Sequence, residues 1–190
     1  ATGWGKKEVE KEESVDKTTK KEQTVEPSPA PAEETTASQE ETSQVNLIPN
    51  GDFSEGVGKW NVYTDGGSCE LNVNAQGQLE VTVTSIGTKE HSAQIYLDGF
   101  GLDTGVEYQL DFDIASSVER KLQWRIQING GDYHPYASNY VTVGTTTQHV
   151  TQTFVMEEGS DPAPRFCFNI GKMDDTPDTI GTHTITIDNM

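Results

Sequence analysis

Alternation of apolar and polar side chains with a period of two runs through most of the chain after residue 45. In 79–86 the aliphatic residues all fall on one face, and 108–117 and 121–130 repeat the pattern. Shorter segments continue it at 140–144, 153–156, 165–171 and 183–189. Because successive side chains of a strand point to opposite faces, the pattern predicts half-buried antiparallel strands.

Clusters of glycine, asparagine and aspartate separate these segments, as at 65–67, 103–105 and 129–131. Such clusters are typical of tight turns. No segment shows helical periodicity sustained over three turns. Roughly eight to eleven short strands joined by turns predict an all-β fold, a two-sheet antiparallel sandwich.

The first 45 residues differ in composition from the rest. Residues 1–44 contain few aliphatic or aromatic side chains and carry a net charge of -5, with a Lys/Glu-rich half followed by a Pro/Ala/Thr/Glu-rich half. So little apolar surface cannot offset the entropy of ordering the chain. We therefore predict a disordered linker or surface tether over 1–45 and a folded domain over 46–190.

Spacers of this composition resemble those that follow the lipid-modified cysteine of Gram-positive surface lipoproteins. This resemblance implies a secreted or cell-surface protein with a lipid anchor upstream. No apolar run approaches the length of a membrane span. The folded part carries a net charge of -13, which repels phosphate backbones and argues against a nucleic-acid partner.

Planar polar groups occupy the outward positions of the predicted strands. Gln123, Arg125, Gln127 and Asn129 alternate with the apolar residues of 121–130. Arg165 and Asn169 do so in 165–171, and Gln94 and Tyr96 form a shorter example. Amides and guanidinium groups offer the fixed donors and acceptors that sugar hydroxyls need, although an ordinary solvated strand face has the same parity.

Two cysteines, Cys69 and Cys167, have no metal-type spacing. An exported protein can form a disulfide, but sequence alone does not tell whether two cysteines meet.

Several stretches resemble family 4 carbohydrate-binding modules and their family 9, 16 and 22 relatives. NLIPNGDFSEGVGKWNVY opens the domain, and QGQLEVTVTSIGT, AQIYLDGFGLDTGVEYQLDFDIASS and WRIQINGGDYHPY follow in the family's order. RFCFNIGK and ITIDN fit the closing strands. The resemblance implies a jelly-roll β-sandwich that binds β-glucan or xylan chains in a cleft on one sheet.

The resemblance also implies individual binding residues. Tyr63 and Tyr133 match stacking aromatics, and His91 replaces an aromatic residue that many relatives carry. The cysteines do not match the family's disulfide positions, so no bridge of the family type is expected. The polar and remaining aromatic positions of the implied site are Gln94, Asp98, Gln123, Arg125, Asn129, Tyr136, Arg165 and Asn169.

A structural calcium ion is implied in the same way. Its ligands would be Asp52, the backbone of Gly77, and Asp188 in the last strand. Calcium binds several oxygens from carboxylates and carbonyls, so the chemistry is sound. Turn capping by the two aspartates is the alternative.

No catalytic constellation is evident. Asp111 and Asp113 share a strand face and faintly resemble the catalytic strand of family 16 glycoside hydrolases, but Ser116 stands where the third carboxylate would be. We therefore expect a non-catalytic binding module that brings either a polysaccharide-degrading enzyme of the same polypeptide or a cell surface to the glycan. A jelly-roll used for adhesion or protein contact remains the alternative, with Tyr63 and Tyr133 as interface anchors.

Overall fold

A computed structural model describes residues 44–190 of the 190-residue chain. The predicted linker at 1–45 falls almost wholly outside the described residues. The ten strands and one 3₁₀ turn of the described part are β1 (Asn61–Thr64), β2 (Ser68–Val73), β3 (Leu79–Ser85), η1 (Glu90–Ser92), β4 (Ala93–Leu97), β5 (Glu107–Ser116), β6 (Arg120–Gln127), β7 (Pro135–Val143), β8 (Gln148–Val155), β9 (Arg165–Asn169) and β10 (His183–Asp188).

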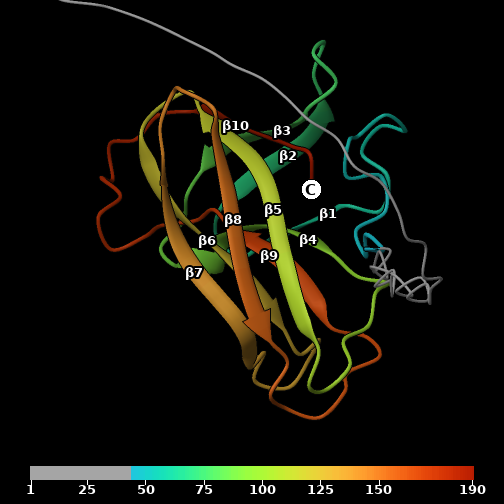
Figure 1. The fold of residues 1–190 in the computed structure, drawn as a ribbon. Coiled ribbons are helices and arrows are strands. Elements are labelled where there is room, and N and C mark those ends of the chain that lie inside the picture. The colour runs from blue at the N-terminus through green and yellow to red at the C-terminus, as the bar shows by residue number, and fades with distance from the viewer. Residues whose placement is uncertain (1–43) are drawn as a thin grey trace, which may run out of the picture. The chain divides into compact units, whose positions relative to one another are not determined.

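The strands form two antiparallel sheets of five strands each. Sheet I has the order β1-β4-β9-β6-β7, and sheet II has the order β2-β3-β10-β5-β8. In Figure 1, β5 and β8 of sheet II cross in front of β6 and β9 of sheet I. The prediction of an all-β, two-sheet jelly-roll sandwich is confirmed.

The core lies between the sheets and follows the alternation seen in the sequence. Leu79, Val81 and Val83 of β3 have no exposed surface, and the inward residues Phe112 and Ile114 of β5 are equally buried. One prediction from the alternation is wrong at its end. Ile128 is 38% exposed because β6 ends at Gln127, before the turn begins.

Aromatic residues from two strands and one loop join the two sheets. Trp60 packs edge-on against Phe166 at 5.8 Å, and Phe166 meets Phe168 at 5.0 Å. Phe168 of sheet I then meets Phe112 of sheet II at 5.2 Å. Edge-to-face contacts of this kind add about 0.5–1.5 kcal/mol each beyond their buried area. They hold sheet I rigidly, and the opposite face of that sheet carries the polar residues.

Both thiols are free and buried, Cys69 on β2 of sheet II and Cys167 on β9 of sheet I. Burial raises the pKa of Cys69 to about 11 and that of Cys167 to about 12. Within 44–190 no helix is long and apolar enough to cross a membrane.

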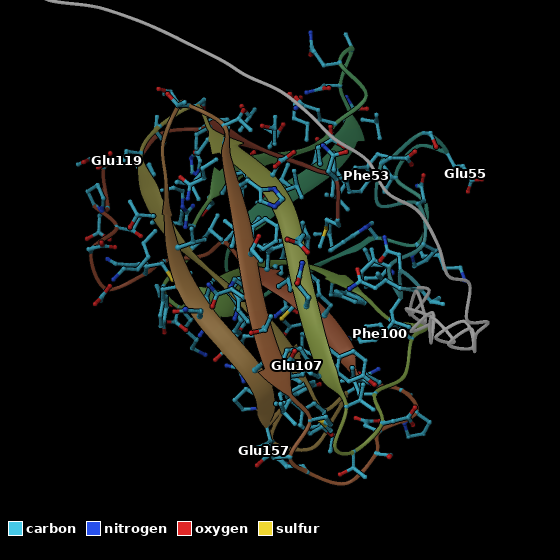
Figure 2. The ribbon with its side chains drawn as sticks, in the orientation of Figure 1. Phe53, Glu55, Phe100, Glu107, Glu119 and Glu157 are labelled. Carbon is cyan, nitrogen blue, oxygen red and sulfur yellow. The ribbon has the colours of Figure 1, made fainter. Side chains whose placement is uncertain are left out.

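The two ends of the domain meet. Met190 N donates to Gly51 O at 3.0 Å, and Asn46 Nδ2 donates to Met190 O at 2.8 Å. Figure 2 labels Phe53, the buried aromatic residue that follows this contact. Glu107 and Glu157 lie at one end of the sandwich in the same view, and Glu119 lies at the other.

Candidate functional site

A hollow of about 280 Å³ lies on the outer face of sheet I. Its lining combines two tyrosines, three amides, two arginines, a histidine and an aspartate. Seven of these nine residues were predicted from the sequence, and Gln127 and Asp132 were not. The lining residues are Tyr63, His91, Gln94, Arg125, Gln127, Asp132, Tyr133, Arg165 and Asn169.

The floor is a ladder of three amides that crosses the strands. Strand register puts Gln94 of β4 opposite Asn169 of β9, and Asn169 opposite Gln123 of β6. Gln94 Nε2 donates to Asn169 Oδ1 at 2.7 Å, and Asn169 Nδ2 donates to Gln123 Oε1 at 2.8 Å. All three residues are buried, which fixes their amide planes. The ladder uses one amide atom of Gln94, which lines the hollow, so Gln94 Oε1 stays available to a ligand.

Tyr63 continues this row at the edge strand. It lies opposite Gln94 in the pairing of β1 with β4, and its side chain is 45% exposed. Side chains directly opposite each other in an antiparallel pair share a face of the sheet. Tyr63 therefore stands beside the amide ladder with an aromatic surface open to a ligand.

Tyr133 reaches the hollow from the β6–β7 loop. Its φ angle of 54° lies in the left-handed region, which bulky side chains rarely adopt. Such strain costs of the order of 1–3 kcal/mol and persists only where the surroundings impose it. Tyr133 N donates to Gly130 O at 3.0 Å, and Arg125 Nη2 donates to Tyr133 O at 2.8 Å. The loop and Arg125 together present a ring that is 46% exposed.

The two arginines differ in how they are paired. Arg165 makes a bidentate ion pair with Asp98, both distances being 2.9 Å, and its guanidinium lies 3.8 Å from the ring centre of Tyr96. The Asp98 hydrogen bonds raise the pKa of Arg165. Arg125 Nε is buried and has no hydrogen-bond partner among the described residues. A buried donor without a partner costs free energy unless water satisfies it.

His91 and Cys167 complete the surroundings of the floor. His91 Nε2 lies 3.5 Å from Asp65 Oδ2, and the histidine side chain is 46% exposed. Cys167 shares the outward parity of Arg165 and Asn169, but it is fully buried beneath the cleft. Cys167 is a small side chain beneath the floor, and its thiol is not exposed to the cleft.

Four predicted site residues do not line this hollow: Asp98, Gln123, Asn129 and Tyr136. Asn129 is exposed in the turn after β6 and does not line it. Tyr136 packs towards the core, and its hydroxyl donates to Asp161 Oδ2 at 2.8 Å. A register shift causes this, because Ile126 pairs with Ala137 while Gln127 pairs with Pro135, which leaves Tyr136 as the extra residue of a bulge.

Parity placed Gln127 on the same face of β6 as Arg125, but the family resemblance did not mark it as a binding residue. Asp132 lies in the turn and carries no such signal. Its Oδ1 accepts from His134 N at 3.2 Å, which helps to shape the loop that presents Tyr133. Asp98 and Gln123 do not line the hollow but hold residues that do. Asp98 pairs with Arg165, and Gln123 accepts a hydrogen bond from Asn169 of the amide ladder.

A larger hollow of about 510 Å³ lies elsewhere, under the segment 44–48 and beside β5. Its lining is dominated by apolar residues such as Phe100, Leu110, Phe154 and Phe166. The chain's own segment forms one of its walls. Its lining contains no arginine, and we assign it to packing of that segment.

The aspartates considered for catalysis lie on the outer face of sheet II. Both contact His149, with Asp113 Oδ1 at 2.7 Å from Nδ1 and Asp111 Oδ1 at 3.3 Å from Nε2. Thr151 Oγ1 also donates to Asp111 at 2.7 Å. Hydrogen bonds lower the pKa of both carboxyls. For Asp113 the largest effect comes from the bond that Asn189 donates. They stay ionised and paired, which is unsuited to a general acid.

Comparison with known proteins agrees with this geometry. Residues 45–179 match the carbohydrate binding domain family CBM_4_9. The chain belongs to this family. CBM_4_9 domains bind sugars without catalysing a reaction, so the folded part of this chain is a non-catalytic carbohydrate-binding module. No curated protein sequence matches the chain.

Solved structures share the fold of this CBM_4_9 domain at low sequence identity. A CBM4 domain is 18% identical with a TM-score of 0.65, covering 74% of this chain and 95% of the other. The N-terminal cellulose-binding domain of β-1,4-glucanase C from Cellulomonas fimi is 20% identical with a TM-score of 0.54, covering 76% and 92%. The second such domain of that enzyme is 20% identical with a TM-score of 0.57, covering 77% and 95%.

The implied calcium ligands lie on segments that adjoin one another along the backbone pairing. Asp52 adjoins Gly51, which bonds to Met190, and Asp188 lies two residues before Met190. Gly77 lies in the β2–β3 turn, next to the start of β3, where Leu79 pairs with Ile187. Within 44–190 no three His, Cys, Asp or Glu side chains gather as metal ligands. Two carboxylates and a carbonyl fit calcium in kind, with the other oxygens left to backbone and water.

Proposed function

We propose that this domain binds a β-linked polysaccharide, β-glucan or xylan, in the hollow on sheet I. One observation supports this above the others: two half-exposed tyrosines flank a rigid floor of amides and guanidinium groups. Tyrosine rings offer flat apolar faces to the C–H side of a sugar ring. Fixed amides offer paired donors and acceptors to its hydroxyls.

The relatives support the same class of ligand. Two of the structures that share the fold are described as cellulose-binding domains of a β-1,4-glucanase. Cellulose is a β-linked glucan, and an open surface hollow suits a long chain better than a small molecule. His91 and Asp132 also line the hollow of this chain. The sugar that it prefers therefore depends on these residues and is not read from the relatives alone.

Affinity electrophoresis tests the proposal. The full chain is run through gels that contain β-1,3-glucan, mixed-linkage glucan, a soluble cellulose derivative, xylan or mannan. We expect retardation by at least one β-glucan or by xylan. Mobility unchanged by all five polymers would refute carbohydrate binding in this hollow and favour a protein-contact role.

Two substitutions locate the binding surface. Tyr63→Ala and Tyr133→Ala should each weaken binding by about fivefold to tenfold, since each ring contributes about 1–1.5 kcal/mol. Val155→Ala is a matched control, because Val155 is 44% exposed on sheet II. The assignment to sheet I is wrong if both tyrosine variants bind as the parent does, or if the control loses binding equally.

We further propose that the domain works outside the cell, where it holds an attached enzyme or a cell surface against the glycan. The composition of residues 1–44 supports a spacer for this purpose. Lipid labelling of the full-length precursor tests the anchor, and an unlabelled, freely secreted product would contradict it.

We propose a structural calcium ion held by Asp52, the carbonyl of Gly77, and Asp188. Bound there, the ion would neutralise carboxylates and tie the N-terminal segment to the last strand. Excess EDTA should then lower the melting temperature, and added calcium should restore it. An Asp188→Asn variant should lose that response, whereas a parent protein indifferent to EDTA would show that no such ion is held.

A further inference from the structure

Tyr140 on β7 extends the row of binding groups beyond the hollow described above. It lies opposite Gln123 in the pairing of β6 with β7. Register therefore gives one continuous row across all five strands of sheet I, which runs from Tyr63 to Tyr140. The members of this row, in strand order, are Tyr63, Gln94, Asn169, Gln123 and Tyr140.

The row has the same construction at both ends. Tyr63 stands on one edge strand and Tyr140 on the other, and each side chain is 45% exposed. The amide ladder fills the three strands between them. With neighbouring strands about 4.8 Å apart, the two tyrosines are separated by roughly 19 Å along the sheet. That length suits several sugar units laid across the strands.

Tyr140 is held in a fixed position. Its hydroxyl donates to Glu90 Oε1 at 2.6 Å, and Lys121 Nζ lies 5.5 Å from its ring centre. Lys121 is itself fixed by Asp174 Oδ1 at 2.9 Å. A ring with one face towards a neighbouring ammonium group and half its surface exposed can offer its other face to a ligand. Fixing it beforehand lowers the entropy cost of binding.

We propose that Tyr140 is a distal stacking platform, and that the glycan runs across the strands from Tyr63 to Tyr140. This inference rests on the proposed function of the same hollow. Tyr140 then makes the site selective for chain length: short oligosaccharides occupy the hollow near Tyr63 and Tyr133, and only longer ones reach Tyr140.

Calorimetry with a ladder of oligosaccharides tests the proposal. Cello-oligosaccharides and xylo-oligosaccharides from disaccharide to hexasaccharide are titrated into the full chain and into Tyr140→Ala, Tyr140→Phe and Tyr63→Ala. We expect Tyr140→Ala to weaken hexasaccharide binding by about threefold to tenfold and to leave the shortest bound oligosaccharide unaffected. Tyr140→Phe keeps the ring and should bind the hexasaccharide within about twofold of the parent.

Three results would overturn the inference while leaving the proposed function intact. In the first, Tyr140→Ala binds the hexasaccharide as the parent does, although Tyr63→Ala loses affinity. In the second, Tyr140→Ala weakens short and long oligosaccharides equally. In the third, Tyr140→Phe loses as much as Tyr140→Ala, which would assign the effect to the Glu90 hydrogen bond. A parent chain that binds none of the oligosaccharides or polymers would instead refute the proposed function itself.

Discussion

Asn169 is the central residue of the amide ladder, and its removal has a calculable cost. It is 3% exposed, accepts from Gln94 Nε2 and donates to Gln123 Oε1. Asn169→Ala removes both hydrogen bonds and leaves two polar atoms, on glutamines that are 7% and 5% exposed, without their partner. Each lost bond costs about 1 kcal/mol, and each buried unpaired group costs about 1–3 kcal/mol unless water replaces the partner.

Because the ladder borders an open hollow, water can enter the space and satisfy part of the loss. We therefore expect a decrease of about 2–4 kcal/mol in the free energy of unfolding. For a domain of this size, 1 kcal/mol shifts the melting temperature by about 2–4 °C, so the total shift is roughly 5–15 °C. Differential scanning calorimetry of the full chain measures it.

Asn72→Ala is the matched control for this experiment. Asn72 lies on β2 of sheet II, where its side chain is exposed. The same truncation there should change stability by no more than about 0.5 kcal/mol. A double variant with Gln94→Ala should be less destabilised than the two single effects added together, because both remove the same hydrogen bond. Equal melting temperatures for Asn169→Ala and the parent would refute the ladder as a rigid floor.

The other predictions concern two histidines and one arginine. Burial lowers the pKa of His183 below its ordinary value of 6.5, so the folded protein binds fewer protons at this residue than the unfolded chain does. The free energy of unfolding should therefore fall as the pH drops below about 6.5. In urea titrations at several pH values His183→Gln should reduce this fall, and an unchanged pH dependence would contradict the prediction. The hydrogen bond to Asp113 raises the pKa of His149 in the folded protein. The stabilisation by protonated His149 is therefore full below the pKa of the unfolded chain and is lost as the pH rises through the raised pKa of the folded protein. His149→Gln should be destabilised more in mildly acidic than in alkaline buffer, and a pH-independent difference would exclude this linkage. Arg125→Ala should weaken glycan binding about tenfold, because it removes the hydrogen bond that holds the Tyr133 backbone. In calorimetry the double variant with Tyr133→Ala should bind the glycan only slightly more weakly than Arg125→Ala does. Additive losses of binding free energy would show that the arginine acts independently of the ring.

The sign for His183 follows from its two neighbours. Gly181 O can only accept, so Nδ1 carries the proton at 2.8 Å, and Arg120 Nη1 can only donate, so Nε2 is the acceptor at 2.9 Å. A second proton on the ring would remove that acceptor and set two positive charges side by side. Arg120 also donates to Gly171 O at 2.6 Å. The neutral histidine is thus part of the contact that joins the beginnings of β6 and β10.

Side-chain parity within a strand was sufficient to predict the buried faces of β3 and β5 and four lining residues on the polar face of sheet I. Parity assigned Gln94, Arg125, Arg165 and Asn169 correctly to one surface. It did not reveal β1, since all four of its residues are exposed and no alternation appears. Short edge strands bury too little for periodicity to mark them.

Two tyrosines show where parity failed. Tyr136 and Tyr140 are four residues apart and would share a face of a regular strand. The bulge, in which Tyr136 has no partner on β6, breaks that relation. Tyr136 therefore turns inward, whereas Tyr140 pairs with Gln123 and stays on the outer face. A bulge depends on the partner strand, and nothing local to 135–143 announces it. Contacts between distant residues, such as Arg120 with His183, are hidden for the same reason.

The cleft residues are held mainly by one another, which bears on how binding energy is used. The amides bond to each other, Arg165 bonds to Asp98 and stacks on Tyr96, and Arg125 holds the strained Tyr133 loop. A ligand therefore meets groups whose rotamers are already fixed and does not bear the cost of ordering them. Because Arg165 is already neutralised by a carboxylate, direction of hydrogen bonds and ring stacking decide affinity more than net charge does. The paired Arg165 and the fixed amides are the arrangement expected for an uncharged, extended ligand.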